Sequence, residues 1–192
     1  LINQQRRALE HISCGELEQA EVLLEQALSY PENLGEGRLV GQNDNDIWYL
    51  LGWCAQLRQQ TARAQQCYRH ALRGDSSLEA GRYYNDQPVD YLFYQAMAQV
   101  QNGNRDGARQ QFQRFIQWGQ AHRDDPVEAD FFAVSLPDLI SLNGNACSIQ
   151  RQHCLFVEAL GHLGLGDIPA FERLIQALLA LNPAHDKAHL LL

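Results

Sequence analysis

Five carboxylates gathered in one short segment are the side chains of this 192-residue chain best suited to chemistry. Pairs of carboxylates are what glycosidic bond cleavage requires, one as acid and one as base or nucleophile. The same residues also suit an ordinary helix start, because Asp125-Pro126 is a common first turn and carboxylates there favour the helix dipole. We favour the helix start and predict no enzyme activity. The five residues are Asp124, Asp125, Glu128, Asp130 and Asp138.

Metal and nucleophile chemistry finds little support in the sequence. His185 and His189 are four residues apart and could share one helix face toward a metal, but no third ligand is evident. Ser135 lacks a G-x-S-x-G setting, and no phosphate-binding loop of the G-x-x-x-x-G-K-[ST] type occurs. We therefore expect no metal and no cofactor.

The cysteines are odd in number, and no pair has C-x-x-C spacing, which argues against a disulfide framework or a zinc site. Free thiols, buried or half-buried, are the expected state, and they favour a cytoplasmic location. The five are Cys14, Cys54, Cys67, Cys147 and Cys154.

Composition narrows the classes of partner. The net charge is −8, and an acidic chain repels phosphate backbones, so we expect no nucleic-acid partner. Lys187 is the single lysine, and no basic run suits a membrane surface. No stretch approaches the roughly 20 apolar residues of a membrane span. The chain starts without methionine or a signal pattern and stops as a helix begins, so we interpret it as a piece of a longer protein.

An internal repeat organises the chain. Ala20, Ala64 and Ala108 are 44 residues apart, and Phe171 follows 63 residues later. A large residue comes four positions after each alanine, and a further packing residue comes three positions after that, which keeps all three on one helix face. The repeated helices occupy residues 15–28, 59–72, 103–116 and 166–179.

A second apolar helix precedes each of the repeated helices, and a short polar turn joins the two, which predicts antiparallel hairpins. The expected fold is all-α: a right-handed α-solenoid of helical hairpins with long inter-repeat inserts, forming one domain over residues 1–192. The hairpins are expected at about 1–30, 46–73, 90–119 and 151–182, with insert helices at about 124–143 and the start of a capping helix at 184–192.

The pattern resembles the tetratricopeptide repeat, most clearly in the second hairpin, at Trp48, Leu51, Gly52, Ala55, Ala64, Tyr68 and Ala71. The match is weaker elsewhere, because Gln59 replaces the turn glycine and Phe171 the packing alanine. The resemblance implies that the first helix of each hairpin lines a concave groove. The inner positions are then expected to be exposed and to bind a partner; they are Asp46, Tyr49, Trp53, Asp90, Phe93, Met97, His153 and Phe156, with Gln56, Val100 and Leu160 beside them. The alternative is that the inserts fold over these residues and make them core.

Three phrases narrow the resemblance: YPENLGEG (30–37), YYNDQP (83–88) and DFFAVSLPDL (130–139). In this order they are similar to the C-terminal repeat region of the YphG-like family of large bacterial proteins. The resemblance implies a β-rich N-terminal region ahead of the repeats and a genetic context of sugar metabolism. It carries no activity over to this chain.

The polar residues of these phrases leave two interpretations open. They could bind a ligand, or they could cap helix ends and satisfy the backbone of the inserts. The first function we predict is a docking scaffold for a protein or peptide, such as the β-rich N-terminal region. The alternative is an accessory module that binds or processes carbohydrate, with a sugar ligand. The insert residues concerned are Asn33, Glu36, Tyr83, Tyr84, Asn85 and Asp86.

Overall fold

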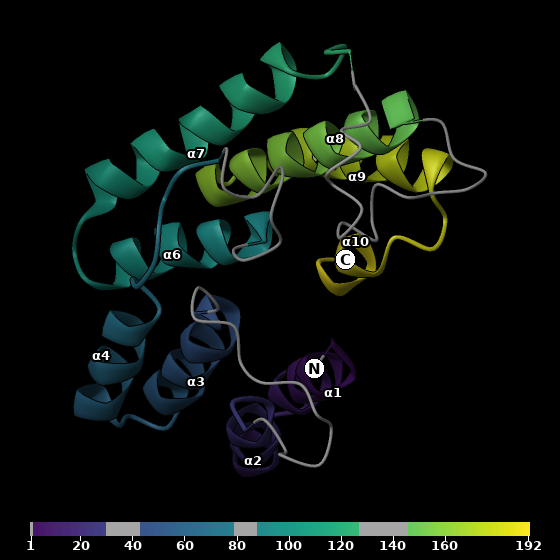
Figure 1. The fold of residues 1–192 in the computed structure, drawn as a ribbon. Coiled ribbons are helices and arrows are strands. Elements are labelled where there is room, and N and C mark those ends of the chain that lie inside the picture. Colours follow the sequence, from purple (N-terminus) through teal and green to yellow (C-terminus); the bar gives the residue numbers. More distant parts are fainter. Residues whose placement is uncertain (1, 30–42, 79–87, 127–145) are drawn as a thin grey trace. The chain divides into compact units, whose positions relative to one another are not determined.

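The computed structural model of the chain describes residues 2–29, 43–78, 88–126 and 146–192, and these residues form helices without strands. Figure 1 labels these helices. They divide into two compact units. Unit 1 contains α1 (Ile2–Ser13), α2 (Leu17–Ala27), α3 (Asn45–Leu57), α4 (Thr61–His70) and α6 (Val89–Gln101). Unit 2 contains α7 (Arg105–Ala121) from Asp106 onward, α8 (Ala146–Leu165), α9 (Ile168–Leu181) and α10 (Asp186–Leu190).

The turns between paired helices share one geometry. Each holds a residue with positive φ: Gly15 at 77°, Gln59 at 61°, Gly103 at 86° and Gly166 at 78°. The next backbone N–H then donates to the carbonyl five residues earlier, at 2.8–2.9 Å, which satisfies the end of the first helix. These four positions repeat the predicted steps of 44, 44 and 63 residues, and Gln59 adopts the left-handed conformation that glycine adopts elsewhere.

Close packing within the second hairpin follows from the small residues predicted there. A Cβ built on Gly52 would lie 2.6 Å from the ring of Tyr68, so only a glycine lets α3 approach α4 this closely. Ala64 of α4 and the C-cap residue Ala71 are buried, as is Tyr68. The small–large–small pattern therefore serves helix contact, as the sequence predicts.

The hairpins of unit 1 stack through both apolar and polar contacts. α3 packs against α2 on one side and α6 on the other, and α6 also contacts α4. The buried Asn45 Nδ2 donates to the carbonyls of Ala71 and Arg73, each at 2.8 Å, and Gln95 Nε2 donates to that of Arg73 at 2.6 Å. Two buried amides thus satisfy carbonyls at the C-terminal end of α4.

Unit 2 is held by close contact between α7 and α8. A Cβ on Gly119 would lie 2.6 Å from the Cys154 carbonyl oxygen, and one on Gly161 would lie 2.7 Å from that of Phe112. α9 begins at the N-cap Asp167, whose side chain accepts the Ala170 N–H at 3.3 Å, and it packs along α8.

The all-α solenoid fold of helical hairpins is confirmed. The assignment of residues 1–192 to a single domain stays a prediction, and most of the insert helices expected at 124–143 lie outside the described residues. No helix among the residues described combines the length and hydropathy needed to cross a membrane.

Candidate functional site

The predicted inner residues of unit 1 meet in a cluster of rings and carboxylates. The ring of Tyr49 lies 5.4 Å from that of Tyr94 and 5.5 Å from that of Tyr68, between ring centroids. Phe93 meets Tyr94 edge to face, with the ring centroids 5.4 Å apart. Burial raises the pKa of Tyr94 above its usual range, and the negative charges of Asp46 and Asp90 raise it further. The two aspartates, 44 residues apart, thus both act electrostatically on one buried phenol.

The expectation that these inner positions are exposed is wrong for several of them. Asp46, Tyr49 and Phe93 are buried in unit 1, and Phe156 is buried in unit 2. Their physical role in the structure is therefore core packing, as in the alternative that the sequence left open, although the inserts themselves are not described. Asp90, Met97 and His153 are half-buried. A binding role for this set stays a prediction.

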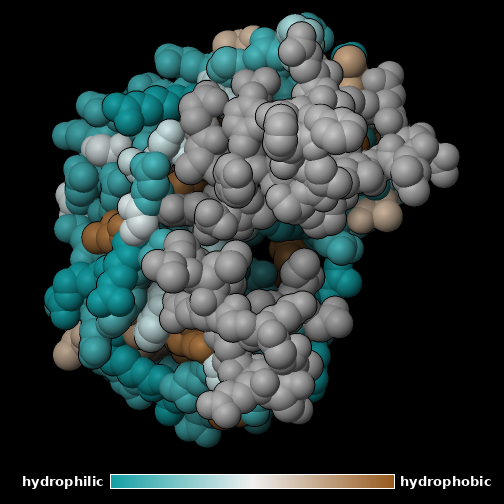
Figure 2. Space-filling model, in the orientation of Figure 1, coloured by the Kyte–Doolittle hydropathy of each residue, from teal (hydrophilic) through white to brown (hydrophobic). Residues whose placement is uncertain are grey.

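An apolar strip remains at the surface of unit 1, and we define it by Trp53 and Leu57 of α3 with Met97 and Val100 of α6. Trp53 is 38 % exposed and Leu57 49 % exposed, one helical turn apart. Met97 and Val100 are half-buried, and Met97 stands in α6 where Trp53 stands in α3, 44 residues earlier. Because α3 and α6 pack together, these corresponding positions lie on neighbouring helices. Figure 2 shows brown hydrophobic residues only as small patches in the described part of the face it draws.

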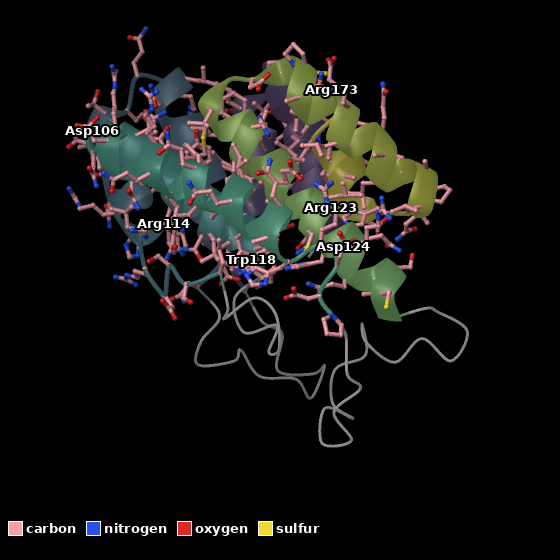
Figure 3. The ribbon with its side chains drawn as sticks, turned by 90° about the horizontal axis from the view of Figure 1, so that it is seen from above. Asp106, Arg114, Trp118, Arg123, Asp124 and Arg173 are labelled. Atoms are coloured by element: carbon pink, nitrogen blue, oxygen red, sulfur yellow. The ribbon has the colours of Figure 1, made fainter. Side chains whose placement is uncertain are left out.

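In unit 2, His153 belongs to a cluster at the end of α7. Its ring meets Trp118 edge to face at 5.5 Å, and Trp118 also contacts His122 at 4.7 Å, both between centroids. Nearby, the buried Glu158 accepts from Gln120 Nε2 at 2.9 Å and from the Arg123 guanidinium. Figure 3 shows Trp118 and Arg123 toward the same end of α7. Glu158 thus links α8 to Gln120 of α7 and to Arg123, which follows α7, so the cluster stabilises the packing of these two helices.

Phe156 is covered at least in part by the segment leading into α10. The His185 ring lies 5.1 Å from the Phe156 ring, and His185 Nδ1 accepts the Ala188 N–H at 3.1 Å as the N-cap of α10. His189 contacts the Pro183 carbonyl through Nε2 at 2.8 Å. The two histidines that could have shared a metal instead fix the chain around α10.

The His185 cap predicts a pH-dependent loosening of α10. Burial lowers the pKa of His185 below its ordinary 6.5, so the folded protein favours the neutral ring that can accept the Ala188 N–H. The cap is fully present above pH 6.5 and is lost as the pH falls from there through the lowered pKa. We expect amide exchange at Ala188, corrected for intrinsic pH effects, to accelerate about fivefold, as the loss of an N-cap of ~1 kcal/mol implies.

Substitution His185→Asn is the control for that experiment. Asparagine caps helices without titrating in this range, so the corrected exchange rate at Ala188 should become independent of pH. If the pH dependence persists in the asparagine variant, another group controls α10.

Several predicted residues lie outside the described residues, namely all six insert residues and Glu128, Asp130 and Asp138. Asp124 is exposed, and Asp125 Oδ2 pairs with His122 Nδ1 at 2.7 Å. Within the described ranges, no group of three or more histidine, cysteine, aspartate or glutamate side chains could hold a metal ion.

Sequence reasoning missed Tyr94 and the charged network of Glu21, Arg58 and Arg63. Arg58 Nη1 donates to Glu21 Oε2 at 2.6 Å, and Arg63 Nη1 approaches the same oxygen at 3.4 Å. Tyr94 directly follows a residue assigned to the groove and could have been recognised from Leu50, the buried residue 44 positions earlier. The charged network joins residues of two different hairpins, so no local sequence pattern indicates it.

Comparison with known families agrees with this geometry. Residues 46–76 and residues 90–117 each match a family model of the tetratricopeptide repeat. No solved structure matches the chain significantly. The two matches fall on the second and third predicted hairpins and do not test the resemblance to the YphG-like family. The chain therefore contains a tetratricopeptide-repeat region, as its turn geometry and small–large–small packing indicate.

Proposed function

We propose that unit 1 is a docking scaffold that binds a protein or peptide along the apolar strip. The observation that supports the proposal is the exposure of Trp53, at 38 %, next to Leu57, at 49 %. A tryptophan at the surface gives a partner a large apolar area, and such residues dominate the energy of many interfaces. Tetratricopeptide repeats generally mediate protein–protein interaction, and helical solenoids bind through extended surfaces.

Polar groups beside the strip suit a peptide. Gln56 Oε1 accepts the Tyr68 hydroxyl at 2.6 Å, which orients its amide NH₂ group as a remaining donor. Gln101 is exposed at the end of α6 and carries a second amide near the strip. Amide side chains that are fixed beside an apolar strip can bind the backbone of an extended segment while the strip binds its apolar side chains.

The finer identity of the partner follows from the resemblance to the YphG-like family. On that basis the partner is the β-rich N-terminal region of the longer bacterial protein, or an external protein that offers an apolar segment. The carbohydrate alternative depended on the insert residues, which lie outside the described part of the chain, and no specific observation favours it.

Trp53→Ala is expected to weaken partner binding at least tenfold, because it removes the largest exposed apolar side chain of the strip. Met97→Ala should have a smaller effect in the same direction, since Met97 is half-buried. The measurement is a titration by calorimetry of the separately expressed N-terminal region, or of a partner purified on the wild-type protein, into each variant.

The matched control is Leu181→Ala, which truncates an exposed apolar residue of unit 2; Leu181 is 44 % exposed, against 38 % for Trp53. It should leave the affinity unchanged. If both strip variants bind as tightly as the wild type while circular dichroism shows intact helices, the strip is not the docking surface.

A further inference from the structure

A hollow of about 550 Å³ lies between α1 and α2 in unit 1 and is separate from the apolar strip. α1 supplies Arg7 and His11 to its lining, and α2 supplies the other lining residues. Its apolar part consists of Val22, which is 53 % exposed, and the half-buried Leu23. The residues that line it are Arg7, His11, Glu18, Gln19, Val22 and Leu23.

Two polar pairs lie beside the hollow, and one arginine has no such partner in the described part of the chain. His11 Nδ1 pairs with Glu16 Oε2 at 2.6 Å, and Glu18 Oε1 pairs with Arg58 Nη2 at 3.0 Å. Arg7 is exposed and has no hydrogen bond or ion pair with any residue that the structure describes. Of the two lining residues that are charged at neutral pH, Glu18 is thus paired within the described ranges and Arg7 is not, and Arg7 lies at the same hollow as the apolar side chains of Val22 and Leu23.

The internal repeat shows what kind of element fits this face. Adding 44 to Arg7, His11, Gln19 and Leu23 gives the corresponding residues of the second hairpin, which are Leu51, Ala55, Arg63 and Cys67. Leu51, Ala55 and Cys67 are buried, and α2 packs against α3 of this hairpin.

The chemistry of that internal contact is acidic and apolar. α2 offers Glu21 and Glu25, which bind Arg63 at 3.4 and 2.7 Å, and Leu24, which is fully buried. In the second hairpin, the face that corresponds to the hollow is thus occupied by an amphipathic helix whose carboxylates meet an arginine.

We propose that the α1/α2 hollow is a docking site for an acidic amphipathic α-helix of a protein partner. The helix lies along the hollow, packs an apolar stripe on Val22 and Leu23, and directs a carboxylate to Arg7. Charge complementarity selects the partner, because a basic helix would meet Arg7 with like charge. This docking is independent of binding at the apolar strip.

A peptide with the sequence of Gly15–Ser29 tests the proposal, because it contains the helix that occupies the corresponding face of the second hairpin. A staple between positions 19 and 23, on the side away from Glu21 and Glu25, keeps this short peptide helical in water. Binding is measured by fluorescence anisotropy at low ionic strength, and the contact surface is mapped by amide chemical shifts in the full chain.

We expect shift changes centred on Arg7, Val22 and Leu23, and about tenfold weaker binding for Arg7→Glu, where attraction becomes repulsion. A peptide in which lysine replaces the glutamates at positions 21 and 25 should bind Arg7→Glu better than it binds the wild type. Arg109→Glu, an exposed charge reversal in unit 2, is the matched control and should bind the original peptide as the wild type does.

Four results would overturn the proposal. The first two are a peptide that fails to bind the folded chain and a peptide that binds Arg7→Glu and the wild type equally. Shift changes centred on Arg58 and Arg63 would mean that the peptide displaces α2, and changes at Trp53 and Leu57 would assign it to the apolar strip. None of these results contradicts docking at the apolar strip.

Discussion

Arg58→Met is expected to destabilise unit 1 by about 3 kcal/mol, because it removes the closest partner of a buried carboxylate. Glu21 has a side chain that is only 7 % exposed, and its Oε2 accepts from Arg58 Nη1 at 2.6 Å. After the substitution only Arg63 remains, at 3.4 Å. A buried charge without a close partner costs several kcal/mol, and the remaining arginine offsets part of that cost.

Substitution of the other partner, Glu21, should destabilise unit 1 less, so the two variants together test the effect of burial. In Glu21→Gln the buried group becomes neutral and can still accept a hydrogen bond from Arg58. The arginine side chains are 27 % and 39 % exposed, so both guanidinium groups can reach water. We expect a loss of about 1 kcal/mol, the value of an ordinary hydrogen bond.

Buried cysteines allow the stability of unit 1 to be measured separately. Cys54 and Cys67 are buried in unit 1, and Cys154 is buried in unit 2. Burial, and next the negative charge of Glu21, raise the pKa of the Cys54 thiol to about 11, so the folded protein holds little reactive thiolate at neutral pH. Alkylation across a urea series, quantified by peptide mass spectrometry, reports the opening of each unit.

In Arg58→Met, Cys54 and Cys67 should react at lower urea concentration than in the wild type, while Cys154 reacts as before. Arg109→Met, an exposed arginine of α7, serves as the control and should change none of the three. If Arg58→Met and Glu21→Gln lower the urea concentration at which Cys54 reacts by the same amount, the difference in burial between Glu21 and the two arginines does not determine the stability of this network.

The hairpins of this chain could be predicted because their signals are local. The left-handed turn residue and the packing residue five positions later recur together, from Gly15 and Ala20 to Gly166 and Phe171. The turn at Gln59, where glutamine replaces the glycine of the other turns, could also be located, because the helices on either side of it keep their spacing.

The candidate site was predicted less well, because exposure depends on contacts between hairpins. Tyr49 and Phe93 occupy inner positions, yet both are buried in the ring cluster around Tyr94. The partners of Glu21 lie 37 and 42 residues away along the chain, so no local pattern relates them. Periodicity shows which face of a helix is apolar, but not whether a neighbour covers that face.

Gly161→Ala is expected to destabilise unit 2 by about 1–3 kcal/mol, the usual cost of overpacking a close helix contact. The sign of the change in stability is informative, because alanine is intrinsically more stable than glycine inside a helix by about 1 kcal/mol. Here the new Cβ would lie 2.7 Å from the Phe112 carbonyl oxygen and 3.0 Å from the Ile116 nitrogen. Both are backbone atoms of α7, so relief requires α7 and α8 to move apart.

Ala177→Gly at an exposed position of α9 measures the propensity effect alone and should cost about 1 kcal/mol. In the urea series, Gly161→Ala should expose Cys154 at lower urea concentration and leave Cys54 unchanged. A gain of stability equal to the loss in Ala177→Gly would mean that α7 and α8 do not need contact at this glycine. A loss in Gly161→Ala instead identifies helix approach, rather than flexibility, as the reason that glycine occupies position 161.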